Sequence, residues 1–148
     1  METIERSTTI AAGSDAVWDV LAKFGAIGVW APNVDHSCLM TEQSEDIGAV
    51  RRIQTGRSTL LETVERWEPT TTLAYRITGL PRVIRSLTST WRLTEADDRT
   101  EVVITTEIDT GPKPPQRLIA KVAGKRLAGA SDQMLDGLRA AVERARDE

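Results

Sequence analysis

The sequence predicts an α+β fold in which a curved, seven-stranded antiparallel sheet and two short helices close over one long C-terminal helix. Three observations support this prediction. Segments of period two follow one another between residues 34 and 109, the stretches that separate them are short and turn-like, and the hydrophobic period becomes helical from about Gln116. Connections this short cannot hold crossover helices, so the strands are expected to pair as an antiparallel meander.

The N-terminal part is predicted to contain one strand and two short helices. The segment "TIERSTTI" alternates weakly and fits a first strand. The "GSD" that starts at residue 13 offers helix-start chemistry before "AVWDVLAKF". Gly25, Gly28 and Pro32 follow closely, so a second helical piece there must be brief.

Six further strands and one long helix complete the prediction. The strands are expected in "VDHSCLMTE", "AVRRIQT", "TLLETVERW", "TLAYRIT", "IRSLTSTWRLT" and "TEVVITTEID". The helix follows "TGPKPP", and its hydrophobic residues fall three to five positions apart: Ile119, Val122, Leu127, Ala130, Met134, Leu138 and Ala141. An amphipathic helix under a curved sheet buries all of these apolar faces at once.

Length, composition and charge limit the classes of function. The 148 residues, 40% of them hydrophobic, fit a single soluble domain spanning residues 1–148. The net charge is −3 with acidic and basic residues interleaved, which predicts no broad basic surface and disfavours nucleic acid and anionic membrane as partners. The expected partner is therefore a small molecule or another protein, with the chain acting as a monomer or homodimer.

Cysteine usage and the N-terminus point to a reducing compartment. Cys38 is the only cysteine, so no intrachain disulfide or cysteine-based metal cluster can form. The start "METIERSTTI" has neither a basic nor an apolar leader segment, and no later run approaches the ~20 apolar residues of a membrane span. We expect a cytoplasmic protein without a membrane span, and we expect no metal and no cofactor.

Alternation along the strands predicts which side chains face the concave side of the sheet. Every second residue of a strand points to the same face, which on the second strand selects Val34, His36, Cys38 and Met40. The candidate ligand-binding residues, with one from the long helix, are His36, Arg51, Ile53, Leu60, Glu62, Val64, Tyr75, Ile77, Leu87, Ser89, Trp91, Ile104 and Met134. An inner face that mixes tryptophan and leucine with serine, tyrosine and charged groups predicts a pocket with a few fixed polar groups rather than a dry core.

Each polar candidate has two interpretations. Glu62 on a concave face needs a partner, and Arg51 on the neighbouring strand can supply it. The two residues form either a structural ion pair or a polar anchor for a ligand. His36 is the only histidine, so it is either a single possible general base or a wall or surface residue. Tyr75 and Trp91 suit packing as well as chemistry. By alternation Arg85 belongs to the inward set of its strand, and the alternative is a position at the pocket mouth or in solvent.

Two turns are candidates for a gate over the pocket. Gly56 in "TGRS" and Gly79-Leu80-Pro81 in "TGLPR" connect successive strand pairs and should lie at the same end of the sheet. An ordinary turn is the alternative, because glycine and proline are common in turns of any function.

Five local stretches resemble the START-like (SRPBCC) superfamily, and within it the polyketide cyclase/dehydrase branch. They are "AVWDVLAKFGAIGVWAP", "IGAVRRI", "LLETVERWEP", "LAYRI" and "STWRL", which occur in the family order and cover nearly the whole chain. The resemblance implies the helix-grip fold and a cavity that takes a small, largely apolar molecule such as a lipid, polyketide or isoprenoid. "HSC", "VRRI" and "LETVE" are also similar to segments lining the hormone pocket of plant abscisic-acid receptors, which aligns His36 with a polar ligand anchor.

Three functions from different classes remain open. The favoured one is a carrier or sensor of a small hydrophobic molecule, because the sequence lacks a strong catalytic constellation. The second is a cyclase, aromatase or dehydratase, a class the resemblance includes, in which Tyr75, His36, Glu62 or Arg51 handles protons and developing enolate charge. The third is a protein-interaction module, which would require a large exposed apolar patch.

Overall fold

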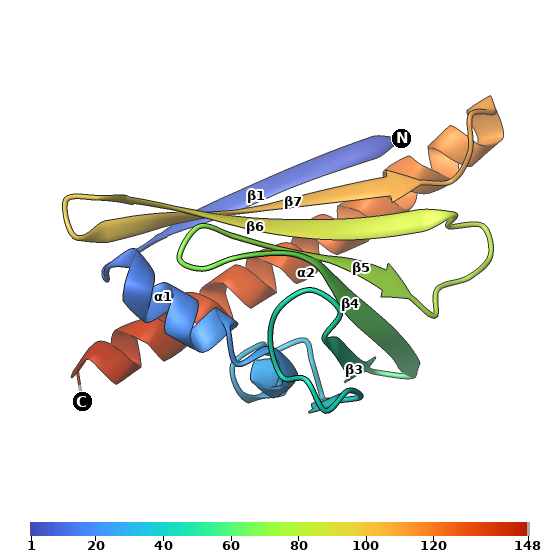
Figure 1. Cartoon of the computed structure of the whole chain (residues 1–148). Coiled ribbons are helices and arrows are strands. Elements are labelled where there is room, and N and C mark those ends of the chain that lie inside the picture. Colours follow the sequence, from blue (N-terminus) through green and yellow to red (C-terminus); the bar gives the residue numbers. More distant parts are fainter. Residues whose placement is uncertain (148) are drawn as a thin grey trace.

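Seven strands form one antiparallel sheet that curves around the long C-terminal helix α2 (Figure 1). The computed structural model describes residues 1–147. The strands are β1 (Glu2–Ile10), β2 (His36–Leu39), β3 (Val50–Thr55), β4 (Ser58–Glu68), β5 (Thr72–Thr78), β6 (Ser86–Ala96) and β7 (Arg99–Asp109). Their order in the sheet is β1-β7-β6-β5-β4-β3-β2, so β2 to β7 form the predicted meander and β1 pairs with β7 at the far edge.

Two short helices separate β1 from β2, as predicted. Helix α1 (Ser14–Leu21) starts directly after Gly13 and buries Val17, Trp18 and Leu21. The second piece, η1 (Phe24–Val29), is a 3₁₀ helix that buries Phe24 and Ile27. Both lie on the side of the molecule where the C-terminal half of α2 runs, and α1 contacts α2 there (Figure 1).

Helix α2 (Pro114–Asp147) crosses the concave side of the sheet. It begins with two prolines, whose fixed φ suits the first helical turn. Its buried face carries Ala120, Gly124, Ser131, Leu135, Leu138 and Val142. Gly137 is required where the helix meets the end of η1, because a Cβ atom there would lie 2.2 Å from the Trp30 carbonyl oxygen.

Strand alternation produces the predicted inner face on β3 to β7, with one irregularity. A β-bulge between Val64 and Arg66 shifts the register of β4 against β5. As a result Trp67 pairs with Leu73 and lies on the same concave face as Val64, although three positions separate the two residues. The bulge therefore brings a large side chain back to the core.

Strands β2 and β6 are shorter than predicted at their starts. The segment before His36 is a turn, in which the Val34 amide donates to the Ala31 carbonyl oxygen. The segment before Ser86 is another turn, closed by the Ile84 amide and the Pro81 carbonyl oxygen. Arg85 consequently precedes β6 and is exposed, which corrects its assignment to the inner face.

Neither of the described α-helices contains an apolar stretch long enough to cross a bilayer.

Candidate functional site

A cavity of about 130 Å³ lies between the concave face of the sheet and the middle of α2. Strands β3 to β7 supply one wall, and Leu127, Ala130, Ser131 and Met134 of α2 supply the other. Eight of the predicted residues line it, seven from strand alternation and Met134 from the long helix: Ile53, Leu60, Glu62, Tyr75, Ile77, Leu87, Ser89 and Met134. Most of the lining is apolar, with a small number of polar side chains among it, as in many small-molecule sites.

Four other predicted residues face inward without lining this cavity. Val64, Trp91 and Ile104 are each 1% exposed and belong to the packed core beside it. Arg51 is also buried and holds Glu62 in place. Alternation found the right face for these residues, but only the volume of the neighbouring side chains decides whether a given position borders empty space.

The prediction that His36 faces the cavity is wrong. His36 is exposed and pairs across the sheet with Gln54, whereas its neighbour Ser37 pairs with the buried Ile53. Directly opposed residues share a face of the sheet, so Ser37 points inward and His36 points outward. The alternation expected from Val34 fails because that residue lies in the turn before β2. The same shift leaves Met40 exposed.

Ser37 has the inward role on β2. Its Oγ donates to the Gly25 carbonyl oxygen and accepts from the Gly28 amide, each at 2.8 Å. These bonds join η1 to the edge of the sheet. They satisfy backbone groups of a short helix that a longer helix would satisfy internally.

Arg51 and Glu62 form the predicted ion pair. Arg51 Nε donates to Glu62 Oε1 at 2.7 Å, and both residues are at most 3% exposed. Arg51 also donates to the Phe24 carbonyl oxygen at 3.0 Å, and its guanidinium carbon lies 3.9 Å from the centre of the Phe24 ring. A second aromatic face, that of Tyr75, lies 4.7 Å away. The buried guanidinium is therefore compensated by a carboxylate, a carbonyl and two rings.

Tyr75 stands at the boundary between the cavity and the packed core. Its hydroxyl oxygen accepts a hydrogen bond from Trp91 Nε1 at 3.0 Å. Burial, with the nearby Glu62 charge, raises the pKa of the Tyr75 hydroxyl to about 12, against the opposing effect of Arg51. Tyr75 thus keeps its proton at neutral pH, and within residues 1–147 that proton has no acceptor.

Several acceptors of hydrogen bonds remain open along the cavity wall. The second carboxylate oxygen of Glu62 accepts no hydrogen bond from a described side chain or amide. Asn33 Oδ1 is buried and has no partner among residues 1–147. The hydroxyls of Ser89 and Thr106, which also line the cavity, share one weak contact of 3.4 Å. The cavity therefore offers a bound molecule the Tyr75 hydroxyl as a donor, together with acceptors and further hydroxyls.

Sequence reasoning missed Asn33 and Ser131 as lining residues. Ser131 could have been predicted, because it lies four residues after Leu127 and so shares its helix face. Asn33 lies in an irregular segment, where no periodicity indicates the direction of a side chain.

An outer groove of about 690 Å³ adjoins the cavity at the end of the sheet where β3 meets β4 and β5 meets β6. The two spaces share five lining residues: Thr55, Leu60, Leu80, Leu87 and Leu127. Gly79, Leu80 and Pro81 border the groove, and so do Thr55 and Ser58 on either side of the turn at Gly56. The two turns predicted to share one end of the sheet do so; a gating role for them stays a prediction.

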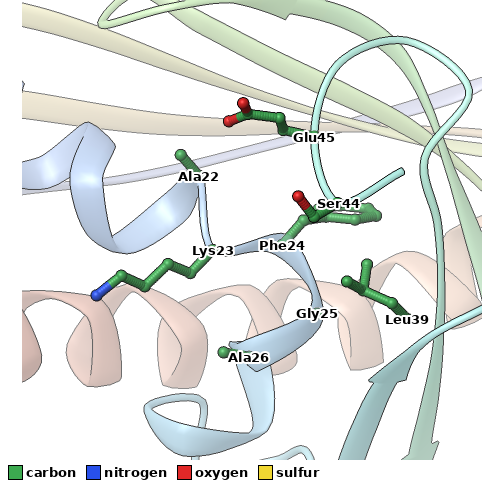
Figure 2. Close-up of a pocket in the computed structure, with 8 residues that line it drawn as sticks. All are labelled: Ala22, Lys23, Phe24, Gly25, Ala26, Leu39, Ser44 and Glu45. Atoms are coloured by element: carbon green, nitrogen blue, oxygen red, sulfur yellow. The ribbon is translucent and has the colours of Figure 1, made fainter. Parts of the chain in front are cut away.

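A separate hollow lies on the other side of η1 (Figure 2). It is lined by Phe24 and Leu39 together with the exposed side chains of Lys23, Ser44 and Glu45. Figure 2 shows the Lys23 ammonium directed away from Glu45. Its polar groups are solvated rather than buried, so we take the concave cavity as the candidate site.

The chain belongs to the polyketide cyclase / dehydrase and lipid transport family, whose model matches residues 1–143. Solved structures with the same fold include the Zhui aromatase/cyclase from a Streptomyces species, which is 22% identical with a TM-score of 0.77 over 97% of this chain and 94% of that one. A protein from Thermobifida fusca is 26% identical, with a TM-score of 0.78 over 97% and 95% of the two chains.

A START superfamily protein from Mycobacterium smegmatis is 12% identical and has a TM-score of 0.73 over 97% of this chain and 98% of its own. These likenesses identify the fold as START-like helix-grip, as the sequence predicted. No curated protein matches the chain in sequence.

Proposed function

We propose that this protein binds a small, largely apolar molecule carrying one neutral polar group, as a carrier or sensor. The observation that supports this best is that the polar-ended inner cavity and the apolar outer groove lie next to one another and share five lining residues. The inner cavity, at about 130 Å³, is smaller than the roughly 300–1,000 Å³ of typical ligand pockets. The groove falls within that range, so the polar end of the ligand would enter the cavity and its apolar part would occupy the groove.

The charge balance of the cavity favours a neutral polar group. Arg51 and Glu62 already neutralise one another, so neither is available to balance a charge on the ligand. A ligand carboxylate would meet the open oxygen of Glu62, which repels it. A hydroxyl or ketone would instead accept from Tyr75, and a hydroxyl could also donate to Glu62, in each case without an uncompensated buried charge.

Native mass spectrometry of protein purified from its host would test this proposal, since a co-purified apolar metabolite would identify the ligand class. Saturable binding of an apolar fluorophore provides the quantitative assay. Ala130→Leu places extra volume into the cavity, and Ala140→Leu makes the same change at an exposed position of α2. We expect the first to weaken fluorophore binding at least about tenfold and the second to leave it unchanged. Equal affinities in both variants would contradict the proposal.

A second candidate is a cyclase- or dehydratase-type enzyme, and the protonated Tyr75 is the observation that favours it. A tyrosine with a pKa of about 12 can donate a hydrogen bond to an oxygen that gains charge, as an enolate does. The one histidine lies outside the cavity, so Glu62 is left as the base that lines it. Arg51 holds this carboxylate in an ion pair. The arrangement therefore suits stabilisation of an anion better than proton abstraction.

Tyr75→Phe separates the two candidates once a ligand is known. For a carrier, the loss of one hydrogen bond should weaken binding by less than about tenfold. For an enzyme, turnover should fall about a hundredfold or more while affinity stays the same. Steady-state kinetics beside equilibrium binding would distinguish these results.

A further inference from the structure

Exposed apolar side chains surround the mouth of the outer groove. On α2, Leu118 is 63% exposed, Val122 59% and Ile119 40%, and all three line the groove. Across the groove, Val83 in the β5–β6 loop is 40% exposed beside the lining residues Pro81 and Ile84. Four large apolar side chains in solvent at the entrance to an apolar groove form a patch that a partner could cover.

Seven exposed basic side chains frame this patch, and we call them the basic rim. They are Arg57, Arg82 and Arg85 in the two turns and Arg117, Lys121, Lys125 and Arg126 on α2. Within residues 1–147 none of the seven forms a salt bridge. They are separated by up to 69 positions in the sequence, and Figure 1 shows that the β5–β6 loop and the start of α2 lie at the same end of the sheet.

Few acidic groups offset the basic rim. Residues 113 to 126 contain no aspartate or glutamate. Asp35 and Asp109 lie at this end, where each accepts a backbone amide hydrogen, from Gly56 and Gly111 respectively. Glu2 borders a small hollow with Arg117 and Lys121. The rim thus remains strongly positive in a chain whose net charge is −3.

The start of α2 carries its apolar and basic residues in adjacent rows. Leu118 and Val122 are four residues apart and share one face of the helix, and Arg117, Lys121 and Lys125 form the row beside them. An exposed apolar row beside a basic row is typical of helices that lie in the interface of an anionic membrane.

We propose that the groove mouth docks on an anionic lipid bilayer. Leu118 and Val122 enter the interface, and the basic rim contacts lipid phosphates. A second copy of the chain fits poorly on this face, because it would bring two basic rims together. The apolar side chains at the groove mouth are 40–63% exposed, and the apolar part of a membrane interface covers such side chains better than the charged surface of an acidic protein would. This docking goes beyond the proposed ligand binding and does not depend on it.

Docking at this face would give the groove a direct opening to the bilayer. An apolar molecule leaving the bilayer would then reach the cavity without crossing water, where its exposed surface is costly. The net charge of −3 gives no indication of this basic surface, because the acidic excess lies elsewhere on the molecule.

Co-sedimentation of the full-length protein with lipid vesicles tests the proposal. One set of vesicles is phosphatidylcholine alone, and the other contains about one-third phosphatidylglycerol, which supplies the anionic surface. We expect binding to the anionic vesicles only, with the bound fraction falling as salt is raised. The triple variant R117Q/K121Q/K125Q should weaken this binding at least about tenfold. L118S/V122S should also weaken it, because it removes the inserted side chains.

A matched control carries the same change in charge at the other end of the molecule. R99Q/R139Q/R144Q alters three exposed arginines away from the groove and should bind vesicles like the unaltered protein. Fluorophore binding in vesicle-free buffer should be the same in the triple variant, its control and the unaltered protein, so failure of docking and failure of ligand binding are distinguishable. Absence of vesicle binding, or equal loss in the triple variant and its control, would overturn the proposal. So would a dimer of the unaltered protein that L118S/V122S dissociates, because the patch would then be a self-interface.

Discussion

The two ends of the space between the sheet and α2 differ in how they are filled. At the end nearer α1, tryptophans pack in edge-to-face pairs, Trp18 with Trp67 at 5.2 Å and Trp30 with Trp91 at 6.0 Å. At the other end, small side chains such as Ser89 and Ala130 face one another and leave the cavity open. One sheet and one helix therefore build both a core and a binding site, and the size of inward side chains separates the two.

The polar side chains also differ between the packed core and the cavity. Next to the core, Trp91 satisfies its N–H on Tyr75, and Arg51 is bound on several sides. Next to the cavity, Glu62 and Tyr75 keep an acceptor and a donor without protein partners among the described residues. Arg51, Glu62 and Tyr75 thus form a boundary between the packed core and the cavity. Their contacts on the core side stabilise the fold, and their open polar groups on the cavity side are available to a ligand.

The largest expected effect concerns this boundary. Arg51→Met or Glu62→Met leaves one buried charge without its partner and should cost about 3–5 kcal/mol of unfolding free energy. The double variant should cost less than either single change, since both charges are then gone. Urea unfolding followed by tryptophan fluorescence measures this.

The exposed pair of Arg76 and Glu65, 3.6 Å apart, is the matched control for these changes. Arg76→Met and Glu65→Met should each cost below about 1 kcal/mol. Small and equal losses of unfolding free energy at both pairs would show that Arg51 and Glu62 are hydrated. The core and the cavity would then not be separated at these residues.

The next effect is a loss of stability at alkaline pH that depends on Tyr75. The folded protein raises the pKa of Tyr75 from 10.0 to about 12, so folding favours the protonated hydroxyl. This contribution is fully present below pH 10 and is lost as the pH rises to about 12, which amounts to about 3 kcal/mol. Tyr75→Phe should lack this part of the decline.

Tyrosinate absorbance offers a direct readout, because Tyr75 is the only tyrosine in the chain. In the folded protein the absorbance should rise near pH 12, and in denaturant near pH 10. A folded-state midpoint at 10 would mean that water reaches the hydroxyl and that the boundary is open to solvent.

Two glycines of α2 test the difference between a tightly packed position and an open one. Gly137→Ala forces a Cβ atom against the Trp30 carbonyl and should destabilise the protein by about 1–3 kcal/mol. Gly129 has no atom within 4 Å of the position of an added Cβ, so Gly129→Ala should stabilise by up to about 1 kcal/mol through helix propensity. Thermal unfolding of both variants gives the signs. Stabilisation by both changes would show that helix propensity, not packing, dominates along α2.

The smallest effect compares neighbours on β2. Ser37→Ala removes two hydrogen bonds to η1 and should cost about 1 kcal/mol. His36→Gln changes an exposed side chain on the other face and should alter neither stability nor fluorophore binding. A loss of binding in His36→Gln at unchanged stability would bring His36 back into the site.

Much of the candidate site could be predicted from alternation. On β4 to β6 the inward residues Leu60, Glu62, Tyr75, Leu87 and Ser89 were found from the strand period and a register set by apolar residues. The ion pair followed from the cost of burying Glu62 alone. The outward position of His36 was missed because Val34 lies in the turn before β2, where strand alternation does not hold, and such a turn depends on contacts with the preceding helical segment.

By itself the sequence determined the order and type of the elements, the inner faces of the central strands and the need to pair Glu62. These properties depend on backbone period and on residue chemistry, which act over a few positions. Only the tertiary structure decided which inward residues border the cavity, because that depends on the volumes that side chains from separate elements leave between them. It also brought Arg57, Arg82 and Arg85 to the end of the sheet where α2 begins with its own basic residues, since strand pairing unites turns far apart in the chain and whole-chain charge carries no information about position.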